Sequence, residues 1–283
     1  MSIFPEAQAK AILTKVVGFS QADECTAQLN GATRGNVRFA RNDVSTAGVT
    51  DDVQLAVQVA FGKRVGTATI NQFDDASLQR VVRRAEELAR LAPENPEFMP
   101  AVPQQTYLKT NTFSAPTAAI DPAYRAKVAS DSIGPCRAEN LVAAGYLEDQ
   151  AGFVAFMNSK GNYGYQTSTS SDYTCTVRTP DGRGSGWVGH NVQDVAQFNA
   201  GEDIRVAMRK ASASAGAQAL EPGKYTVILE PAAAAGLVAF MMYFFDARSA
   251  DEGRSFLSKK GGGNKLGEQV YGPQVTMFTD PAY

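Results

Sequence analysis

The feature that most constrains the fold is an apolar segment late in the chain. From Ala232 to about Ala247 the residues are almost purely hydrophobic, and a β-branched run at residues 225–229 before them predicts a strand. Pro231 suits the first position of a helix. A helix that is apolar all round has no face for water, so we expect it to be buried. At about sixteen residues it is shorter than the roughly twenty that span a membrane. The segment therefore predicts a central helix inside a protein core.

The residues around this helix resemble those of the TldD/PmbA family of peptidases. The resemblance rests on the strand–Pro–helix unit, on the segment GRSFLSKKGGGNKLGEQVYGPQVTMFTDP that follows it, and on the turn Asn158-Ser159-Lys160-Gly161. The phrases RGNVRFARNDVSTAGV and RAEELARLAPENP extend it toward the N-terminus. It runs from about Asn36 to the end of the chain. Family members normally continue beyond this point, so the resemblance implies a chain that is incomplete at its C-terminus.

Active members of this family carry His-Glu-x-x-x-His on the central helix, where the histidines bind zinc and the glutamate is the base. In the register that we favour, Ala239, Phe240 and Phe244 occupy these positions. Zinc sites need imidazole, thiolate or carboxylate ligands, and none of these three side chains supplies one. The resemblance therefore implies a PmbA (TldE)-like member with no metal and no catalytic residue of its own. We expect Phe240 to be a buried packing residue.

Two functions are compatible with this resemblance. The first is a non-catalytic subunit of a cytosolic metallopeptidase complex that degrades unfolded peptides. A paralogous TldD-like partner would supply the zinc, and extended peptides would be held by strand addition. The alternative is a stand-alone peptide-binding or scaffold protein. The candidate substrate- or partner-binding residues are Arg248, Arg254 and Phe256, directly after the helix. Local ion pairs at the helix exit are the other interpretation of the two arginines, because exposed pairs are common and weak.

Composition narrows the class of partner and the compartment. The chain has 283 residues, 44% of them hydrophobic, and a net charge of −2, so it lacks the basic footprint of a nucleic-acid-binding protein. Cys25, Cys136 and Cys175 form no C-x-x-C pair, which fits a reducing cytoplasm. The N-terminus has no apolar signal region. We expect a cytoplasmic protein that contacts neither nucleic acid nor membrane.

Three further motifs indicate little chemistry. Gly184, Gly186 and Gly189 match G-x-G-x-x-G, but the residues after them make a poor helix start, which a dinucleotide site requires. His190, the only histidine, has no visible partner in the GRGSGW loop region, and we interpret it as an exposed polar residue. The glycines at 261–263 lack a following G-K-[ST] and are interpreted as a mobile loop.

The order of predicted elements indicates an α+β fold with mixed or antiparallel sheets. Strict alternation predicts a strand at 53–61 that turns at Gly62-Lys63 into a second strand at 64–70. Prolines at 93, 96, 100 and 103 predict a stiff connector, so we divide the chain into domains 1–103 and 104–283. The remaining expected elements are helices at 5–17, from 75, 121–133 and 203–217, and strands at 143–147, 152–158, 162–167 and 173–179.

Overall fold

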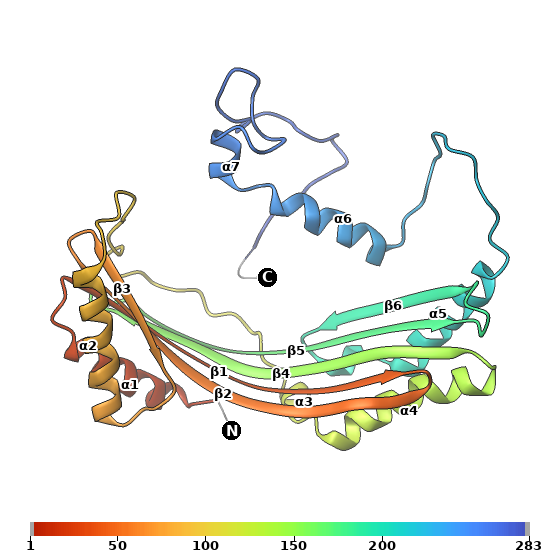
Figure 1. Cartoon of the computed structure of the whole chain (residues 1–283), viewed down its shortest axis with the longest axis horizontal. Coiled ribbons are helices and arrows are strands. Elements are labelled where there is room, and N and C mark those ends of the chain that lie inside the picture. The colour runs from red at the N-terminus through yellow and green to blue at the C-terminus, as the bar shows by residue number, and fades with distance from the viewer. Residues whose placement is uncertain (1–2, 281–283) are drawn as a thin grey trace. The chain divides into compact units, whose positions relative to one another are not determined.

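A computed structural model describes residues 3–280, and its chain divides into two compact units after Ala217. The first unit is built on one antiparallel sheet of six strands in the order β3-β2-β1-β4-β5-β6 (Figure 1). The second unit, from Gln218 on, contains two helices and long connecting segments. The α+β class predicted from the sequence is confirmed.

The sheet and its helices follow one another along the chain. The first unit contains α1 (Glu6–Phe19), β1 (Glu24–Ala40), β2 (Asp43–Phe61), β3 (Arg64–Ile70), α2 (Asp75–Leu91), α3 (Ala115–Ala118), α4 (Pro122–Ala138), β4 (Val142–Asn158), β5 (Tyr163–Arg178), β6 (Ser185–Val192), the 3₁₀ turn η1 (Val195–Gln197) and α5 (Ala200–Ser214). The second unit contains α6 (Pro231–Tyr243) and α7 (Ala247–Asp251).

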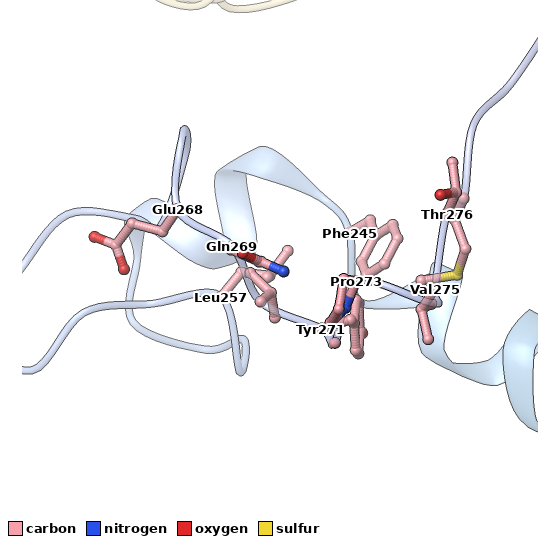
Figure 2. Close-up of a pocket in the computed structure, with 11 residues that line it drawn as sticks. Phe245, Leu257, Glu268, Gln269, Tyr271, Pro273, Val275 and Thr276 are labelled. Carbon is pink, nitrogen blue, oxygen red and sulfur yellow. The ribbon is translucent and has the colours of Figure 1, made fainter.

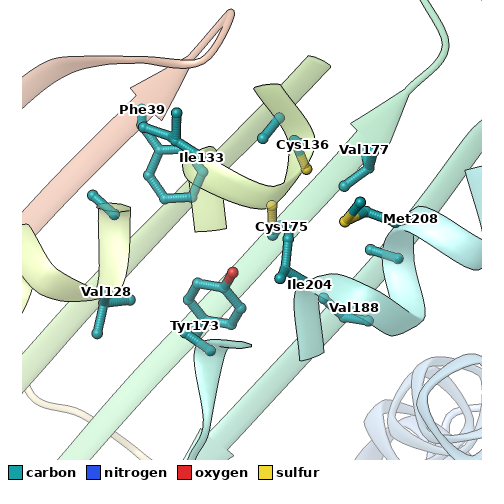
Figure 3. Packing of buried hydrophobic residues seen from close by; sticks show 14 of the residues in the cluster. Phe39, Val128, Ile133, Cys136, Tyr173, Cys175, Val177, Val188, Ile204 and Met208 are labelled. Atoms are coloured by element: carbon teal, nitrogen blue, oxygen red, sulfur yellow. The ribbon is translucent and has the colours of Figure 1, made fainter. Parts of the chain in front are cut away.

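Two hydrophobic cores share one face of the long sheet. One core packs α1 and α2 against the start of β1, the end of β2 and the end of β4. The other packs α4 and α5 against the opposite ends of the strands, where Tyr173, Cys175, Ile204 and Met208 meet (Figure 3). Successive side chains of a strand point to opposite faces. The buried residues of β1 in both cores, from Cys25 to Phe39, keep one alternation, so they lie on the same face.

A polar seam separates the two cores in the middle of the sheet. Its centre is the ion pair of Arg125 on α4 with Asp149 on β4, in which Nε lies 2.5 Å from Oδ2 and Nη2 lies 2.7 Å from Oδ1. Both side chains are buried. Gly35 on β1 makes room for the guanidinium, because a Cβ there would lie 1.8 Å from Nη2. Ser114 and Thr169 continue the seam through a 2.9 Å hydrogen bond from the Ser114 amide.

The proline-rich connector is not the point at which the compact units divide. Strands from either side of it, β1 and β4, pair along most of their length. The connector itself lies along the first unit: the Ala101 amide donates to Glu24 Oε2 at 2.9 Å, and the Thr169 amide donates to the Thr112 carbonyl at 2.9 Å. The two compact units therefore divide after Ala217, and the domain boundary at residue 103 stays a prediction.

Several strands are longer than the sequence pattern indicates. The expected pairs at 143–147 with 152–158, and at 162–167 with 173–179, are each one continuous strand, β4 and β5. Their middles carry the polar seam, whose Glu, Asp, Gln and Ser residues look like turns in the sequence. Helix α4 likewise continues through Gly134 and Pro135 to Ala138, beyond the end predicted at residue 133. By contrast, the turn at Gly161 forms as predicted, with φ of 88°.

The central helix forms, but the structure does not bury it. None of the residues of α6 is buried, and Phe240 is 67% exposed. The strand predicted at 225–229 pairs with no other strand in the described residues, and Ile228 is 98% exposed. Between residues 218 and 280, only the short α7 and an isolated bridge between Ser258 and Asn264 accompany α6. The expectation of a buried central helix is therefore wrong for this chain, because its second unit offers α6 too little to pack against.

Across residues 3–280, every helix falls short of the length and hydrophobicity that crossing a membrane requires.

Candidate functional site

The residues assigned to the zinc motif and the candidate binding residues all lie in the second unit, on α6 and α7 or directly after them. At the positions assigned to the zinc motif, Phe240 and Phe244 touch edge to face with ring centroids 5.3 Å apart. Alanine and phenylalanine side chains hold no donor atom for a metal. Among residues 3–280, no group of three or more His, Cys, Asp or Glu residues is arranged to hold a metal ion. Zinc therefore does not fit this part of α6, and the register of the motif stays a prediction.

Helix α7 begins at a well-formed cap. Asp246 is its N-cap residue and accepts a hydrogen bond of 2.7 Å from the Ser249 amide. The side-chain hydrogen bond to Ser249, followed by the backbone one, lowers the pKa of this carboxyl group. A carboxylate at a helix N-terminus also interacts favourably with the helix dipole. The cap fixes the direction in which the chain leaves α6.

Arg248 and Arg254 meet on one carboxylate. Arg248 Nε donates to Glu252 Oε1 and Arg254 Nε donates to Glu252 Oε2, each at 2.9 Å. These two hydrogen bonds lower the pKa of Glu252. All three side chains are exposed, so the local ion pairs anticipated as the alternative interpretation do form. A role of either arginine in binding a substrate or partner stays a prediction.

The glycine loop is a tight turn between two short paired segments. Gly261, Gly262 and Gly263 have φ of 96°, 109° and 79°, a region that side chains rarely adopt. The Lys259 amide donates to the Gly263 carbonyl at 2.9 Å. Beyond the turn, the ammonium group of Lys259 lies 2.6 Å from Glu268. The glycines therefore serve the turn that folds residues 264–277 back toward α7.

This fold-back forms an open pocket of about 490 Å³ (Figure 2). Its volume falls in the range of small-ligand sites. Phe256 borders it, with its ring centroid 5.9 Å from that of Phe245 and 6.4 Å from that of Tyr271. The Tyr271 hydroxyl oxygen is buried and makes no hydrogen bond within the described residues. The lining residues are Phe245, Leu257, Glu268, Gln269, Val270, Tyr271, Gly272, Pro273, Val275, Thr276 and Met277.

The pocket can hold an apolar side chain, and its chemistry is that of binding. Glu268 is the one charged residue of its lining, and it is paired with Lys259. Sequence reasoning selected Phe256 but missed the pocket itself. The segment from Gln269 to Met277 contributed to the family resemblance but did not indicate a pocket, because its apolar residues follow neither helical nor strand spacing consistently. Only the turn glycines before it signalled that the chain folds back.

In the first unit, His190 has a partner that the sequence did not reveal. His190 Nε2 lies 2.9 Å from Asp203 Oδ1 on α5. Burial raises the pKa of Asp203, and the neighbouring imidazole opposes this shift. His190 is exposed, as we interpreted it, but it does have a partner, because α5 returns beside β6 after the intervening loop.

The G-x-G-x-x-G match has a packing explanation. Gly184 and Gly186 lie directly beneath α5, where an added Cβ would come within 2.1 Å of the Ala211 and Ala207 carbonyl oxygens. Residues 185–192 continue as strand β6, so no helix begins at the motif. A dinucleotide site, which needs a helix N-terminus there, is absent from this loop.

Comparisons with known proteins agree with the fold. The model for the PmbA/TldA metallopeptidase domain 1 matches residues 29–89, and the model for the PmbA/TldA metallopeptidase C-terminal domain matches residues 222–283. No curated protein has a significantly similar sequence. TldE from Thermococcus kodakarensis is 13% identical, with a TM-score of 0.65 over 72% of this chain and 47% of that one.

Two further solved structures are similar. A protein described as a modulator of a DNA gyrase, from Thermotoga maritima MSB8, is 15% identical with a TM-score of 0.80, over 92% of this chain and 60% of that one. One described as a modulator of DNA gyrase from Bacteroides thetaiotaomicron VPI-5482 is 14% identical with a TM-score of 0.75, over 89% and 59%. At these identities the likeness shows the fold. The chain spans about half to three fifths of the length of these neighbours.

The fold and the two family models together define a metallopeptidase-like α+β protein. The chain belongs to the TldD/PmbA family.

Proposed function

We propose that this chain is a TldE/PmbA-like, non-catalytic subunit of a cytoplasmic TldD/TldE-type metallopeptidase complex. A paralogous TldD-like chain supplies the zinc and the catalytic base, and the pair acts in the proteolysis of unfolded peptides. The observation that carries the proposal is the absence of donor atoms at Ala239, Phe240 and Phe244, on the helix where the family's zinc motif belongs.

The exposed apolar surface of the second unit supports a partner. Phe240 and Tyr243 on α6 are 67% and 80% exposed, and the β-branched segment at 225–229 before them is exposed as well. Soluble monomers rarely expose a contiguous apolar surface of this kind, and permanent complexes bury such surfaces in their interfaces. A paralogous chain would cover α6 and the preceding segment.

The test is co-expression with a zinc-bearing paralogue from the same genome, followed by an assay on an unstructured peptide. The two chains should elute together, and the paralogue should cleave faster in the complex. Phe240→Asp should weaken the complex, because a charge would enter an apolar interface. Leu91→Asp is the matched control, since Leu91 is an equally apolar and 83% exposed residue of the first unit. If the paralogue elutes alone with unchanged activity, the proposal fails.

A stand-alone peptide-binding or scaffold protein is the second candidate. It is favoured by one observation: residues of the second unit line a pocket of about 490 Å³ with a single charged side chain, Glu268 (Figure 2). Measuring zinc distinguishes the two candidate functions only if co-purification of the chain with the paralogue is measured as well. A purified complex should contain zinc in proportion to the paralogue, whereas a stand-alone protein should bind peptides without it.

A further inference from the structure

The pocket of the second unit has a positive charge at its rim. Lys265 is joined to the pocket wall at two points: its backbone amide donates to the Leu257 carbonyl and its Nζ donates to the Phe256 carbonyl, each at 2.8 Å. Leu257 lines the pocket, and the Phe256 ring borders it. Both acceptors are neutral, and within residues 3–280 the Lys265 ammonium group is paired with no carboxylate. An unbalanced cation therefore lies at the edge of an apolar cavity.

The acidic residue of the lining does not offset this charge. The Glu268 carboxylate lies 2.6 Å from the Lys259 ammonium group, so its charge is already balanced. Figure 2 shows the Glu268 side chain directed away from Phe245 and Tyr271. The glycine loop at 259–265 contains three lysines and no acidic residue. The charge around the pocket thus favours an anionic group on a bound molecule.

The walls of the pocket favour an aromatic body for that molecule. The rings of Phe245 and Tyr271 are tilted against the Phe256 ring by 49° and 57°. Tilted and edge-to-face contacts are those that aromatic rings prefer, and the thioether of Met277 in the lining adds a sulfur that contacts rings well. The Tyr271 hydroxyl is buried and has no hydrogen-bond partner in the described part of the chain. Because buried polar groups normally have a partner, this hydroxyl is available to an oxygen atom of a ligand.

We propose that this pocket binds a small aromatic carboxylic acid in its ionised form, with the ring among Phe245, Phe256 and Tyr271 and the carboxylate at Lys265. The site goes beyond the subunit role proposed above and does not rest on it. Its volume of about 490 Å³ suits a small molecule. A peptide is a poorer occupant, because the described residues from 218 on contain a single isolated bridge, Ser258 with Asn264, and no strand edge that could hold a peptide backbone.

The experiment uses the full chain alone and naphthylacetate as the probe. Titration by saturation-transfer NMR should give a dissociation constant on the order of 1 mM, as expected for a ligand of this size. Neutral naphthylacetamide should bind about fivefold more weakly, since it lacks the ion pair with Lys265, and cationic naphthylethylamine should bind more weakly still. Added salt should weaken binding of the acid and not of the amide. Hydrogen exchange should slow at 268–277 and stay unchanged in the first unit.

Two variants separate the charge from the hydroxyl. Lys265→Gln should weaken binding of the acid about fivefold and leave binding of the amide unchanged, so the amide reports that the pocket is intact. Lys224→Gln is the matched control, because Lys224 is an exposed lysine of the same unit in the segment before α6, and it should change neither. Tyr271→Phe keeps the ring and removes the hydroxyl, which should weaken both ligands about fivefold.

Equal affinity for the acid and the amide, tighter binding of the amine, or unchanged exchange at 268–277 would overturn the assignment. So would binding of the peptide Gly-Gly-Gly-Phe with a free carboxylate when naphthylacetate does not bind, because the occupant would then be a peptide end. No paralogue is present in these measurements. Their failure therefore leaves the co-expression result untouched, and failure of the co-expression test leaves this site untouched.

Discussion

Arg125 and Asp149 form a two-point ion pair at the centre of the sheet, between the two hydrophobic cores. Its two N–O distances are 2.5 and 2.7 Å, and both side chains are less than a tenth exposed. The guanidinium also reaches the Ile120 carbonyl at 3.4 Å. This pair joins α4 to β4 in the polar seam, in addition to the apolar contacts that α4 makes with β4 in the neighbouring core.

Removing one partner should destabilise the fold strongly. Asp149→Ala leaves the Arg125 charge buried without its partner, which should lower the free energy of unfolding by about 3–5 kcal/mol. Urea denaturation monitored by circular dichroism measures the loss. Asp131→Ala on α4 is the control, because its pair with Lys127 is exposed and should contribute less than about 0.5 kcal/mol. Equal effects of the two substitutions would mean that the pair is not the junction we describe.

Gly186 should not tolerate a side chain. An added Cβ would lie 2.1 Å from the Ala207 carbonyl oxygen and 2.7 Å from the Ala211 amide nitrogen, both in the backbone of α5. Gly186→Ala should therefore cost about 1–3 kcal/mol as α5 is displaced from β6. Gly134→Ala is the matched control. That glycine lies inside α4 with open space around it, so alanine should be neutral or stabilising by up to about 1 kcal/mol.

Glu86 should make part of the stability dependent on pH. Burial raises the pKa of Glu86, but the hydrogen bond from the Gln21 amide and the hydrogen bond and charge of Arg83 outweigh it, so the pKa falls below its ordinary value of 4.5. Folding therefore favours the ionised form. This contribution is complete above pH 4.5 and is lost as the pH falls through the lower, folded-state pKa.

Glu86→Gln should isolate that contribution. At pH 7 the variant should lose about 1.5–3 kcal/mol, the usual value of hydrogen bonds to a charged group. The difference from the wild-type chain should shrink as the pH falls through the acid range, as followed by urea denaturation at each pH. Glu87→Gln, whose carboxylate makes an exposed pair with Arg84 at 3.5 Å, should change little at any pH. A constant difference between wild type and Glu86→Gln would contradict the assignment.

Phe240 should contribute little to the stability of the isolated chain. A buried phenylalanine would cost about 3–5 kcal/mol on truncation, but Phe240 is 67% exposed. Phe240→Ala should therefore lie within about 0.5 kcal/mol of wild type. Phe39→Ala, at 1% exposed in the second of the two cores, should show the full core cost. A large loss for Phe240→Ala would indicate that α6 packs against other residues in solution.

The sequence predicted those features that depend on local patterns. The strand predicted at 53–61 became the end of β2, and the helix predicted from residue 75 became α2, where the N-cap Asp74 accepts from the Ser77 amide at 2.9 Å. The turn at 158–161 also formed, with Gly161 at a φ of 88°. These elements are specified by residues close together in the chain, so their patterns could be read without knowing the fold.

The sequence predictions failed where contacts between residues far apart in the chain determine the structure. Glu148, Asp149 and Gln150 look like a turn because nothing nearby explains buried polar residues in a strand, yet Arg125 makes Asp149 a buried partner. The phosphate-loop interpretation of Gly184 and Gly186 was rightly rejected, but their packing against α5 could not be predicted, because the approach of α5 is not visible in the sequence. The pocket beside Tyr271 depends on a chain reversal that only the glycines at 261–263 announced. The exposure of α6 depends on which other elements pack against it, and the hydrophobic pattern of the helix does not contain that information.

The pairing of β1 with β4 has a consequence for the order of events during synthesis. The core under α1 and α2 contains Phe153 and Ala155 from β4, in addition to residues of the first three strands. That core cannot close on the ribosome until β4 has emerged, although α1, α2 and the β2–β3 hairpin are made long before. Contacts this distant in sequence slow folding, because the chain loses loop-closure entropy before the contacts contribute any favourable free energy. Until then, the apolar faces of α1 and α2 have no complete sheet to pack against.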